Sequence, residues 1–125
     1  MEKLNKVNNI LVVDDEKAIR FTTKAILSKE GYEVSTAKGY CEALDLMAKG
    51  DFDLIFADVK LDDKTGFDIL RDAKKLYPTC PVVLFTGHPN IVSESKAFLL
   101  GAHDFVSKPL TKDKLLHMVK MILHN

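Results

Sequence analysis

Five short apolar runs, separated by segments with helical periodicity, constrain the fold of this chain more than any other feature. The runs occupy residues 10–13, 32–36, 54–58, 82–85 and 104–107. Each precedes a stretch in which apolar residues recur every three or four positions, the spacing of a helix with one buried side. Strands that alternate with helices form a parallel sheet covered by helices on both faces. The sequence therefore predicts a doubly wound α/β fold.

The composition of the runs indicates the order of the strands. Runs 10–13, 54–58 and 82–85 are almost continuously apolar, as is typical of central strands buried on both faces. Runs 32–36 and 104–107 mix polar and apolar residues, which favours edge positions. Edges at the second and fifth strands give the order 2-1-3-4-5, the flavodoxin-like (βα)5 arrangement. We expect a single domain over 1–125, with its core at about 9–123.

Glycine, proline and threonine indicate where the predicted helices begin and end. We expect helices to stop at Gly31, Gly50, Pro78 and Gly101, and a last helix to begin after Thr111. In the first helix, the residues expected on one side are Ala18, Ile19, Phe21, Thr22, Ala25 and Ile26. In the third, the residues expected to point inward are Leu70, Ala73, Leu76 and Tyr77.

Charge and cysteine usage argue against several classes of protein. The 18 basic side chains balance the 18 acidic ones, so we expect no direct binding to nucleic acid and no attraction to anionic membranes. No apolar stretch approaches membrane-spanning length, and the N-terminus lacks a signal peptide, so we expect a cytoplasmic protein. Cys41 and Cys80 lack the spacing of a zinc site or disulfide framework, so we expect reduced, mostly buried thiols.

Three acids are predicted to meet at one edge of the sheet. Asp14 and Asp15 follow the first run, and Asp58 ends the third. In the predicted order these strands are neighbours at the topological switch point, where ligands bind in open α/β sheets. Carboxylates a few Å apart repel by ~4 kcal/mol per close pair at an effective dielectric constant near ~20, so we expect a cation between them. All-oxygen ligands in a small site favour Mg²⁺ over Ca²⁺.

Each acid taken alone has an equally good structural explanation. Residues 14–16 could cap and charge the start of a helix, and Asp58 could be a turn residue. The neighbouring strand ends favour a function. Thr86 ends the fourth strand and Lys108 follows the fifth, so a hydroxyl and an ammonium face the acids and can bind phosphoryl oxygens. Gly87 leaves backbone room beside Thr86. Together these residues suggest phosphoryl transfer.

This ordered set of residues resembles the receiver domain of bacterial two-component response regulators. The residues that carry the resemblance are Asp14-Asp15, Asp58, Thr86-Gly87 and Lys108-Pro109, in this order. Segments 10–16 and 101–109 are similar to the family, and Gly66 falls where the family usually has glycine. The resemblance covers about residues 9–123, nearly the whole chain.

The resemblance implies a phosphoacceptor and a metal site. It implies that Asp58 accepts a phosphoryl group from a phosphohistidine on a sensor histidine kinase or histidine phosphotransfer protein, with small phosphodonors as a further source. Asp15, Asp58 and the backbone carbonyl of Lys60 are expected to bind Mg²⁺, and Asp14 to assist through water. The expected protein is not a conventional enzyme, although it would catalyse its own Mg²⁺-dependent phosphorylation and dephosphorylation.

The resemblance also implies a switch. Lys108 is expected to pair with the phosphoryl group, Thr86 to swing toward it, and Phe105 to turn inward. The face formed by the fourth helix, fifth strand and fifth helix would then change, to control an output domain or effector protein. The Lys108–Pro109 bond is expected to be cis.

Some positions depart from the commonest pattern of the family. The switch aromatic is Phe105 rather than tyrosine, so it lacks a hydroxyl with which to hydrogen-bond. Asp62 stands where the loop after the acceptor often has proline, which predicts a looser loop. Lys60 and His88 flank the expected phosphoryl site, and we predict that they control how water reaches the acyl phosphate and hence its lifetime.

Two predicted helices carry more apolar residues than a core needs. Residues 97–100 are apolar in succession and sweep most of the way round a helix, so they cannot all face the core. In the last helix, two methionines broaden the core stripe. The residues expected on a partner face, for an effector or a homodimer, are Phe98, Leu99, Leu100, Met118 and Met121. Scattered surface hydrophobes are the simpler explanation for each helix alone. The three remaining histidines, expected at the surface without a metal role, are His103, His117 and His124.

Other functions fit the residues less well. A haloacid-dehalogenase-like phosphatase has its second aspartate two residues after the nucleophile, and Asp14-Asp15 lacks that spacing. A flavin carrier would need a hydroxyl- and glycine-rich phosphate loop where this chain has acids. A degenerate receiver used only for binding would not need the complete set of acids, hydroxyl and lysine.

Overall fold

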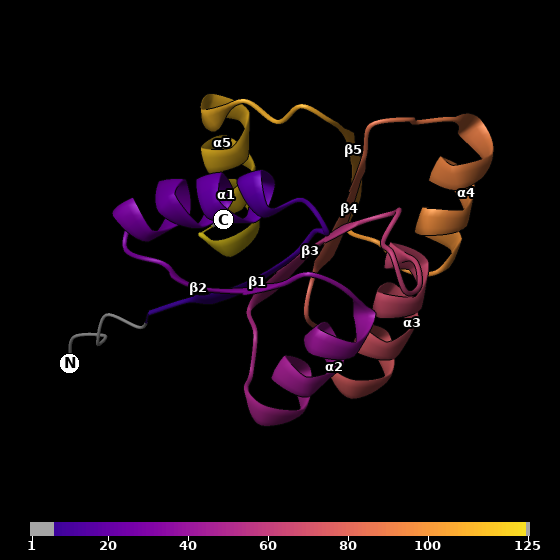
Figure 1. Cartoon of the computed structure of the whole chain (residues 1–125), viewed down its shortest axis with the longest axis horizontal. Coiled ribbons are helices and arrows are strands. Elements are labelled where there is room, and N and C mark those ends of the chain that lie inside the picture. The colour runs from indigo at the N-terminus through magenta and orange to yellow at the C-terminus, as the bar shows by residue number, and fades with distance from the viewer. Residues whose placement is uncertain (1–6, 125) are drawn as a thin grey trace.

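A five-stranded parallel sheet lies between two layers of helices in the computed structural model (Figure 1), which describes residues 7–124. Residues 1–6 and 125 of the expected domain lie outside the described range. The strands are β1 (Asn9–Val13), β2 (Glu33–Ala37), β3 (Leu54–Asp58), β4 (Val82–Thr86) and β5 (Asp104–Ser107). The helices are α1 (Lys17–Lys29), α2 (Tyr40–Lys49), α3 (Gly66–Leu76), α4 (Ile91–Leu99) and α5 (Lys112–Leu123).

The strand order β2-β1-β3-β4-β5 confirms the predicted flavodoxin-like topology. All neighbouring strands are parallel. Every residue of β3 and β4 is buried, as their continuous apolar runs predict, whereas the edge strands β2 and β5 carry exposed residues. The carboxyl ends of β1, β3 and β4 therefore meet at one rim, from well-buried strands.

Alternate residues of the central strands feed two separate cores. Ile10 and Val12 of β1 face α1 and α5, and their cluster includes Leu115 and Val119. Leu11 and Val13 face the opposite way, into a cluster with α2, α3 and α4. Figure 1 shows the same division, with α1 and α5 on one face of the sheet and the other three helices on the opposite face. Both faces of the sheet are thus covered.

The helix ends follow the signals in the sequence. Gly31 and Gly101 have φ values of 95° and 98°, the left-handed conformation that favours glycine after a helix. Thr111 caps α5 by accepting a hydrogen bond from the Lys114 N–H at 3.2 Å. Asn90 caps α4 in the same manner through the Ser93 N–H. These caps confirm the predicted stop at Gly101 and start at Thr111.

Six predicted burials are wrong: the exposed residues are Ala18, Phe21, Thr22 and Ala25 of α1, Cys41 of α2 and Leu76 of α3. Phe21 and Cys41 are exposed for the same geometric reason. Phe21 is 74% exposed and Cys41 is exposed, whereas Ile19 and Ala43, each two positions away, face the protein. Residues two apart on a helix point about 200° away from each other, so they cannot share a buried side. Leu76 is also exposed, because it is the last residue of α3 and its neighbour Tyr77 packs against the core instead.

The helices are all short, at most the 13 residues of α1. Across residues 7–124, none is long and apolar enough to cross a bilayer.

Candidate functional site

Strand register brings the predicted site residues to one rim. Val13, at the end of β1, lies opposite Ala57 of β3, so Asp14 follows β1 beside Asp58. Asp58 lies opposite Phe85 of β4, one residue before Thr86. Asp14 and Asp58 thus come from neighbouring strands at the switch point, as the sequence predicts.

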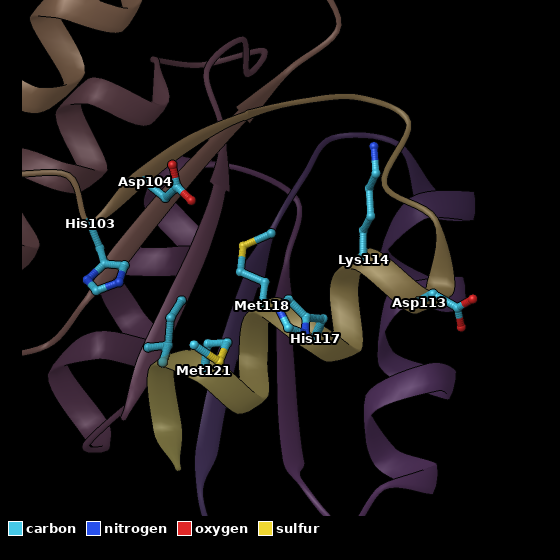
Figure 2. Close-up of a pocket in the computed structure, with 8 residues that line it drawn as sticks. His103, Asp104, Asp113, Lys114, His117, Met118 and Met121 are labelled. Atoms are coloured by element: carbon cyan, nitrogen blue, oxygen red, sulfur yellow. The ribbon is translucent and has the colours of Figure 1, made fainter. Parts of the chain in front are cut away.

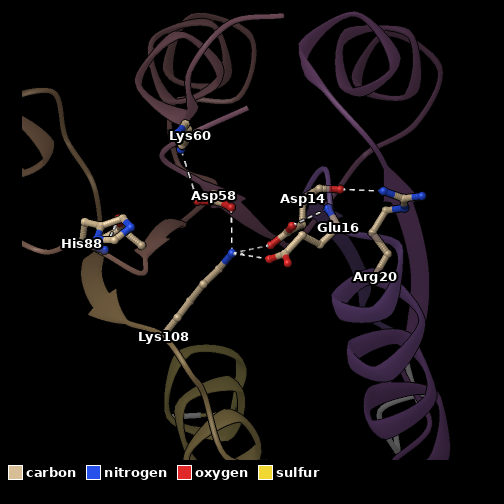
Figure 3. A network of polar contacts seen from close by, with 8 residues as sticks. Asp14, Glu16, Arg20, Asp58, Lys60, His88 and Lys108 are labelled. Atoms are coloured by element: carbon tan, nitrogen blue, oxygen red, sulfur yellow. Dashed lines mark hydrogen bonds and ion pairs between the residues drawn. The ribbon is translucent and has the colours of Figure 1, made fainter. Parts of the chain in front are cut away.

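Lys108 joins the acids at this rim (Figure 3). Its ammonium Nζ lies 2.7 Å from Asp58 Oδ2, 2.9 Å from Asp14 Oδ2 and 3.6 Å from Glu16 Oε1. Asp14 is fully buried and Asp58 is 6% exposed, so this ion pairing lies largely away from water. Nζ also lies 5.1 Å from the centroid of the Phe85 ring, a cation–π contact. One ammonium therefore partly neutralises two buried carboxylates.

Burial and ion pairing shift the pKa values of this cluster in a consistent way. Burial raises the pKa of Asp14, and the Glu16 N–H and the Lys108 ammonium offset this only in part. Burial lowers the pKa of Lys108, but its contacts with Asp58 and Asp14 more than compensate, so this pKa is raised overall. Lys108 therefore remains protonated, while the site holds more negative charge than a single ammonium balances.

The carboxylates fit a small divalent cation. One oxygen each from Asp14, Asp15 and Asp58 lies within 4.8 Å of the other two. Asp14 Oδ2 is buried and, within the described part of the chain, accepts no well-aligned hydrogen bond despite its ion pair with Lys108. A buried carboxylate oxygen in this position is suited to a cation or its bound water. An all-oxygen set of acids is the set that Mg²⁺ prefers.

Residues of the loop that follows Asp58 fix the position of its side chain and backbone through hydrogen bonds and close packing. The Lys60 N–H donates to Asp58 Oδ1 at 3.2 Å, and the Val59 N–H donates to the Phe85 carbonyl at 3.0 Å. Gly66 packs against the Asp58 carbonyl so closely that a Cβ there would lie 2.4 Å from this oxygen. Any side chain at Gly66 would therefore displace the backbone of Asp58. The metal-binding role of the Lys60 carbonyl stays a prediction.

Thr86 is buried at the end of β4, and its hydroxyl oxygen accepts the His88 N–H at 3.0 Å. Its own hydroxyl hydrogen is therefore free to be donated elsewhere. The Lys108 N–H donates to the Thr86 carbonyl at 2.8 Å, which ties the ends of β4 and β5 together. Gly87 and His88 are exposed, and a Cβ at Gly87 would meet open space.

Phe105 of β5 lies opposite Leu84 and is buried within the core on the α2, α3 and α4 face. It also lines a small hollow that includes Ile91 and Glu94 of α4. Phe105 already points inward here, so its predicted turn on phosphorylation stays a prediction. The Lys108–Pro109 peptide bond is cis, as expected.

Three of the five residues predicted on a partner face are exposed, and the binding of a partner there stays a prediction. Phe98, Leu99 and Met121 are exposed, and Leu99 is 87% exposed. Leu100 is instead partly buried against one core and Met118 against the other, because each lies toward the inward-facing side of its helix. Met118 and Met121 line a groove beside His103 and Asp104 at the start of β5; the side chains drawn in Figure 2 show it.

Sequence reasoning missed two further apolar residues on α4. Ile91 and Val92 are 79% and 78% exposed. They precede Phe98 and Leu99 by seven positions, which is two helical turns, so the four side chains share one side of the helix. That seven-residue spacing is the signal in the sequence that could have located them.

The remaining histidines are exposed, as predicted: His103, His117 and His124. Between residues 7 and 124, the acids at the rim form the one group of potential ligands close enough to share a metal ion.

The fold and the site define a class of flavodoxin-like proteins with an acidic, lysine-paired site at the switch point of the sheet. The chain belongs to the response regulator receiver domain family, whose profile matches residues 10–120. Membership implies phosphorylation-dependent signalling, and receiver domains generally bind Mg²⁺.

Similar proteins and solved structures are also response regulators or receiver domains. A putative NtrX-like response regulator of Rickettsia bellii is 35% identical over 114 residues, which cover 90% of this chain and 24% of that protein. A CheY-like receiver domain protein from Methanospirillum hungatei superposes with a TM-score of 0.90 and 34% identity, over 93% of both chains. The solution structure of the beryllofluoride-activated NtrC4 receiver domain dimer superposes with a TM-score of 0.86 and 34% identity, over 91% of this chain and 94% of that one. The chain spans about a quarter of the length of the curated relatives it matches first.

Proposed function

We propose that this chain is a phosphorylation-dependent switch in the cytoplasm, with Asp58 as its phosphoacceptor. The donor would be a phosphohistidine on a sensor histidine kinase or histidine phosphotransfer protein, and a small phosphodonor would serve in vitro. The observation that carries the proposal is the meeting of Asp14, Asp15 and Asp58 within 4.8 Å, with Lys108 2.7 Å from Asp58. A fold gains no stability from gathering three acids, so the cluster favours chemistry.

The proposed reaction is an in-line transfer to the Asp58 carboxylate. A carboxylate oxygen forms a bond to phosphorus while the bond from phosphorus to the donor imidazole nitrogen breaks. The electron pair of that bond leaves with the imidazole, which takes up a proton, and Asp58 becomes an acyl phosphate. The site's task is positioning and charge stabilisation. The protein would thus act on itself, during phosphorylation and dephosphorylation, rather than as a conventional enzyme.

Lys108 and Thr86 are proposed to bind the transferred group. The Lys108 ammonium, already 2.7 Å from Asp58 Oδ2, needs to move little to pair with a phosphoryl oxygen on that carboxylate. The Thr86 hydroxyl accepts the His88 N–H, so its hydrogen is available for a second phosphoryl oxygen. Gly87, where even a Cβ would meet open space, leaves room for the group.

Mg²⁺ is the proposed cofactor. Asp15, Asp58 and the Lys60 carbonyl would hold it directly, and Asp14 through water. When bound, the ion would supply positive charge that neutralises the acids and the phosphoryl oxygens. Asp14 Oδ2 supports this set, because it is buried and accepts no well-aligned hydrogen bond from residues 7–124 beside its ion pair with Lys108.

The proposed output is a change in the surface formed by α4, β5 and α5. Thr86 moves toward the phosphoryl group, and Phe105, which lies on the adjacent strand and lines a hollow beside α4, adjusts to that shift. Phe98, Leu99 and Met121, exposed on this surface, would then bind an output domain or effector protein. A homodimer is a further candidate, because the related NtrC4 receiver domain forms a dimer when activated with beryllofluoride.

Intact mass measurement tests the phosphoacceptor directly. Incubation with Mg²⁺ and acetyl phosphate, a small phosphodonor, is expected to add one phosphate to the wild-type protein and none to Asp58→Asn. Asp62→Asn is the matched control, because Asp62 is an exposed acid four positions along the same loop, and it should be phosphorylated normally. Absence of any gain with all donors would favour a receiver that only binds partners.

Lys60 and His88 are proposed to set the lifetime of the acyl phosphate. Lys60 hydrogen-bonds to Asp58 through its backbone, and both side chains are exposed near the site. Lys60→Ala and His88→Ala should change the dephosphorylation rate by altering how water reaches the phosphoryl group. An unchanged rate in both variants would contradict this role.

A further inference from the structure

The loop that follows Asp58, residues 59–65, is held more firmly than its sequence predicts. Lys60 and Thr65 form an isolated antiparallel bridge, and the Gly66 N–H donates to the Val59 carbonyl at 2.9 Å. Leu61 is buried in the core. The loop is therefore closed at its base without the proline that Asp62 replaces. Its exposed tip, residues 62–64, is anchored to the start of α2.

The main contact comes from Asp63, whose carboxylate reaches the start of α2. The Tyr40 N–H donates to Asp63 Oδ1 at 3.0 Å, and the Cys41 N–H donates to Asp63 Oδ2 at 3.2 Å. The N-cap residue of α2 is Gly39, which has no side chain to accept these bonds. Asp63 thus accepts hydrogen bonds from two N–H groups at the start of α2, the role that the side chain of an N-cap residue normally has. It does so from a segment more than twenty residues away in the sequence.

Gly39 and Asp63 are fitted to each other. A Cβ on Gly39 would lie 2.7 Å from Asp63 Oδ1 and 3.1 Å from Oδ2. The φ of Gly39 is −167°, an extended conformation that any residue adopts, so the glycine is not required by the backbone. What it provides is space for the Asp63 carboxylate.

A second contact reinforces the first. Lys64 Nζ lies 4.5 Å from the centroid of the Tyr40 ring, and the Tyr40 hydroxyl donates to Asp72 Oδ2 of α3 at 2.6 Å. The N–H groups of Tyr40 and Cys41 also lower the pKa of Asp63, so its carboxylate is ionised at neutral pH. A negative charge is favourable at a helix N-terminus.

We propose that Asp63 is a positioning residue for the phosphoacceptor site: by capping α2 from the loop tip, it fixes the backbone of Lys60 relative to Asp58. The Lys60 N–H already binds Asp58 Oδ1, and its carbonyl is the proposed metal ligand, so movement of this loop changes the site. This inference rests on the proposed function, because it concerns the same metal and acceptor site. It gives the loop a rigidity that the sequence alone does not indicate.

The test compares the Mg²⁺ dissociation constants of five variants and the wild-type protein by calorimetry. Asp63→Ala should weaken Mg²⁺ binding roughly tenfold, in the range seen when groups that orient metal ligands are removed. Asp63→Asn keeps an oxygen acceptor and should retain part of the affinity. Gly39→Ala should resemble Asp63→Ala, because its Cβ displaces the carboxylate. In the double variant the two effects should not add.

Asp62→Ala is the matched control, because it removes an equal charge from the adjacent position. Asp62 is exposed and makes no hydrogen bond or ion pair with residues 7–124, so Mg²⁺ affinity should stay within about twofold of wild type. Amide hydrogen exchange at Tyr40 and Cys41 should accelerate in Asp63→Ala and Gly39→Ala but not in Asp62→Ala. All measurements should be made at a temperature at which circular dichroism shows that every variant is folded.

The outcomes separate the two proposals. Faster exchange at Tyr40 and Cys41 with unchanged Mg²⁺ affinity would make Asp63 a structural cap only and overturn the positioning role. Equal losses of affinity in Asp62→Ala and Asp63→Ala would attribute the effect to charge and also overturn it. If the wild-type protein itself binds no Mg²⁺, the proposed function fails, and the role of Asp63 fails with it.

Discussion

The site at the strand ends and the outer side of α4 depart from the usual pattern of burial in opposite directions. The site buries charge, in Asp14 and Asp58, whereas α4 exposes large apolar side chains, with Leu99 most exposed of all. Burying charge and exposing apolar surface are both unfavourable for an isolated fold. Departures of this kind are expected where function, rather than folding, sets the residue.

The two regions differ in what offsets the cost. At the site, Lys108 lies within 3 Å of both buried acids, so part of the negative charge is balanced from inside the chain. At α4, no element among residues 7–124 covers Leu99 or Ile91. The site thus carries a counter-charge of its own, whereas the apolar side chains on the outer side of α4 have no cover within residues 7–124. β4 and β5 connect them, because Thr86 and Phe105 lie on these adjacent strands.

The largest expected effect comes from removing the internal balance at the site. Lys108→Met, measured in metal-free buffer by chemical denaturation, should lower the free energy of unfolding by about 3 kcal/mol, because it leaves two buried carboxylates without their cation. Lys112→Met is the control, since Lys112 is an exposed lysine at the start of α5, and it should change the free energy by less than about 0.5 kcal/mol. Equal small effects would mean that the site is not internally balanced.

A smaller effect should come from adding a cation. Mg²⁺ at ten times its dissociation constant should raise the free energy of unfolding of the wild-type protein by about 1.4 kcal/mol through mass action. A chelator should reverse the gain, and Asp58→Asn should reduce it, because one of the three clustered acids is lost. A gain that persists in Asp58→Asn would separate the metal from the acid cluster and contradict the proposed ligand set.

The rim of the sheet was predictable from sequence because strand patterns fix both order and register. Continuous apolar runs identify central strands, and a parallel arrangement brings their carboxyl ends together, so Asp14 and Asp58 meet without further information. Lys108 and Thr86 follow from the same rule. Pattern therefore located the residues of the site, although not the distances among them.

Features set by contacts between distant segments were not predictable in this way. The hydrogen bonds from α2 to Asp63 join residues more than twenty positions apart, and the sequence shows only a missing proline nearby. The exposure of Phe21 and Cys41 depends on how each helix is rotated on the sheet, which a run of small and apolar residues leaves ambiguous.

The smallest expected effect on stability belongs to α4. Leu99→Ser should change the free energy of unfolding by no more than about 0.5 kcal/mol, because the side chain is 87% exposed and leaves no cavity when shortened. Leu84→Ala, a fully buried leucine of β4, should lower it by about 2–5 kcal/mol in the same denaturation experiment. A loss of 2 kcal/mol or more in Leu99→Ser would show that the chain itself covers this side of α4, and the contrast between the two regions would fail. A small change, combined with weaker self-association of Leu99→Ser in sedimentation with beryllofluoride, would mean that this leucine is retained for a partner.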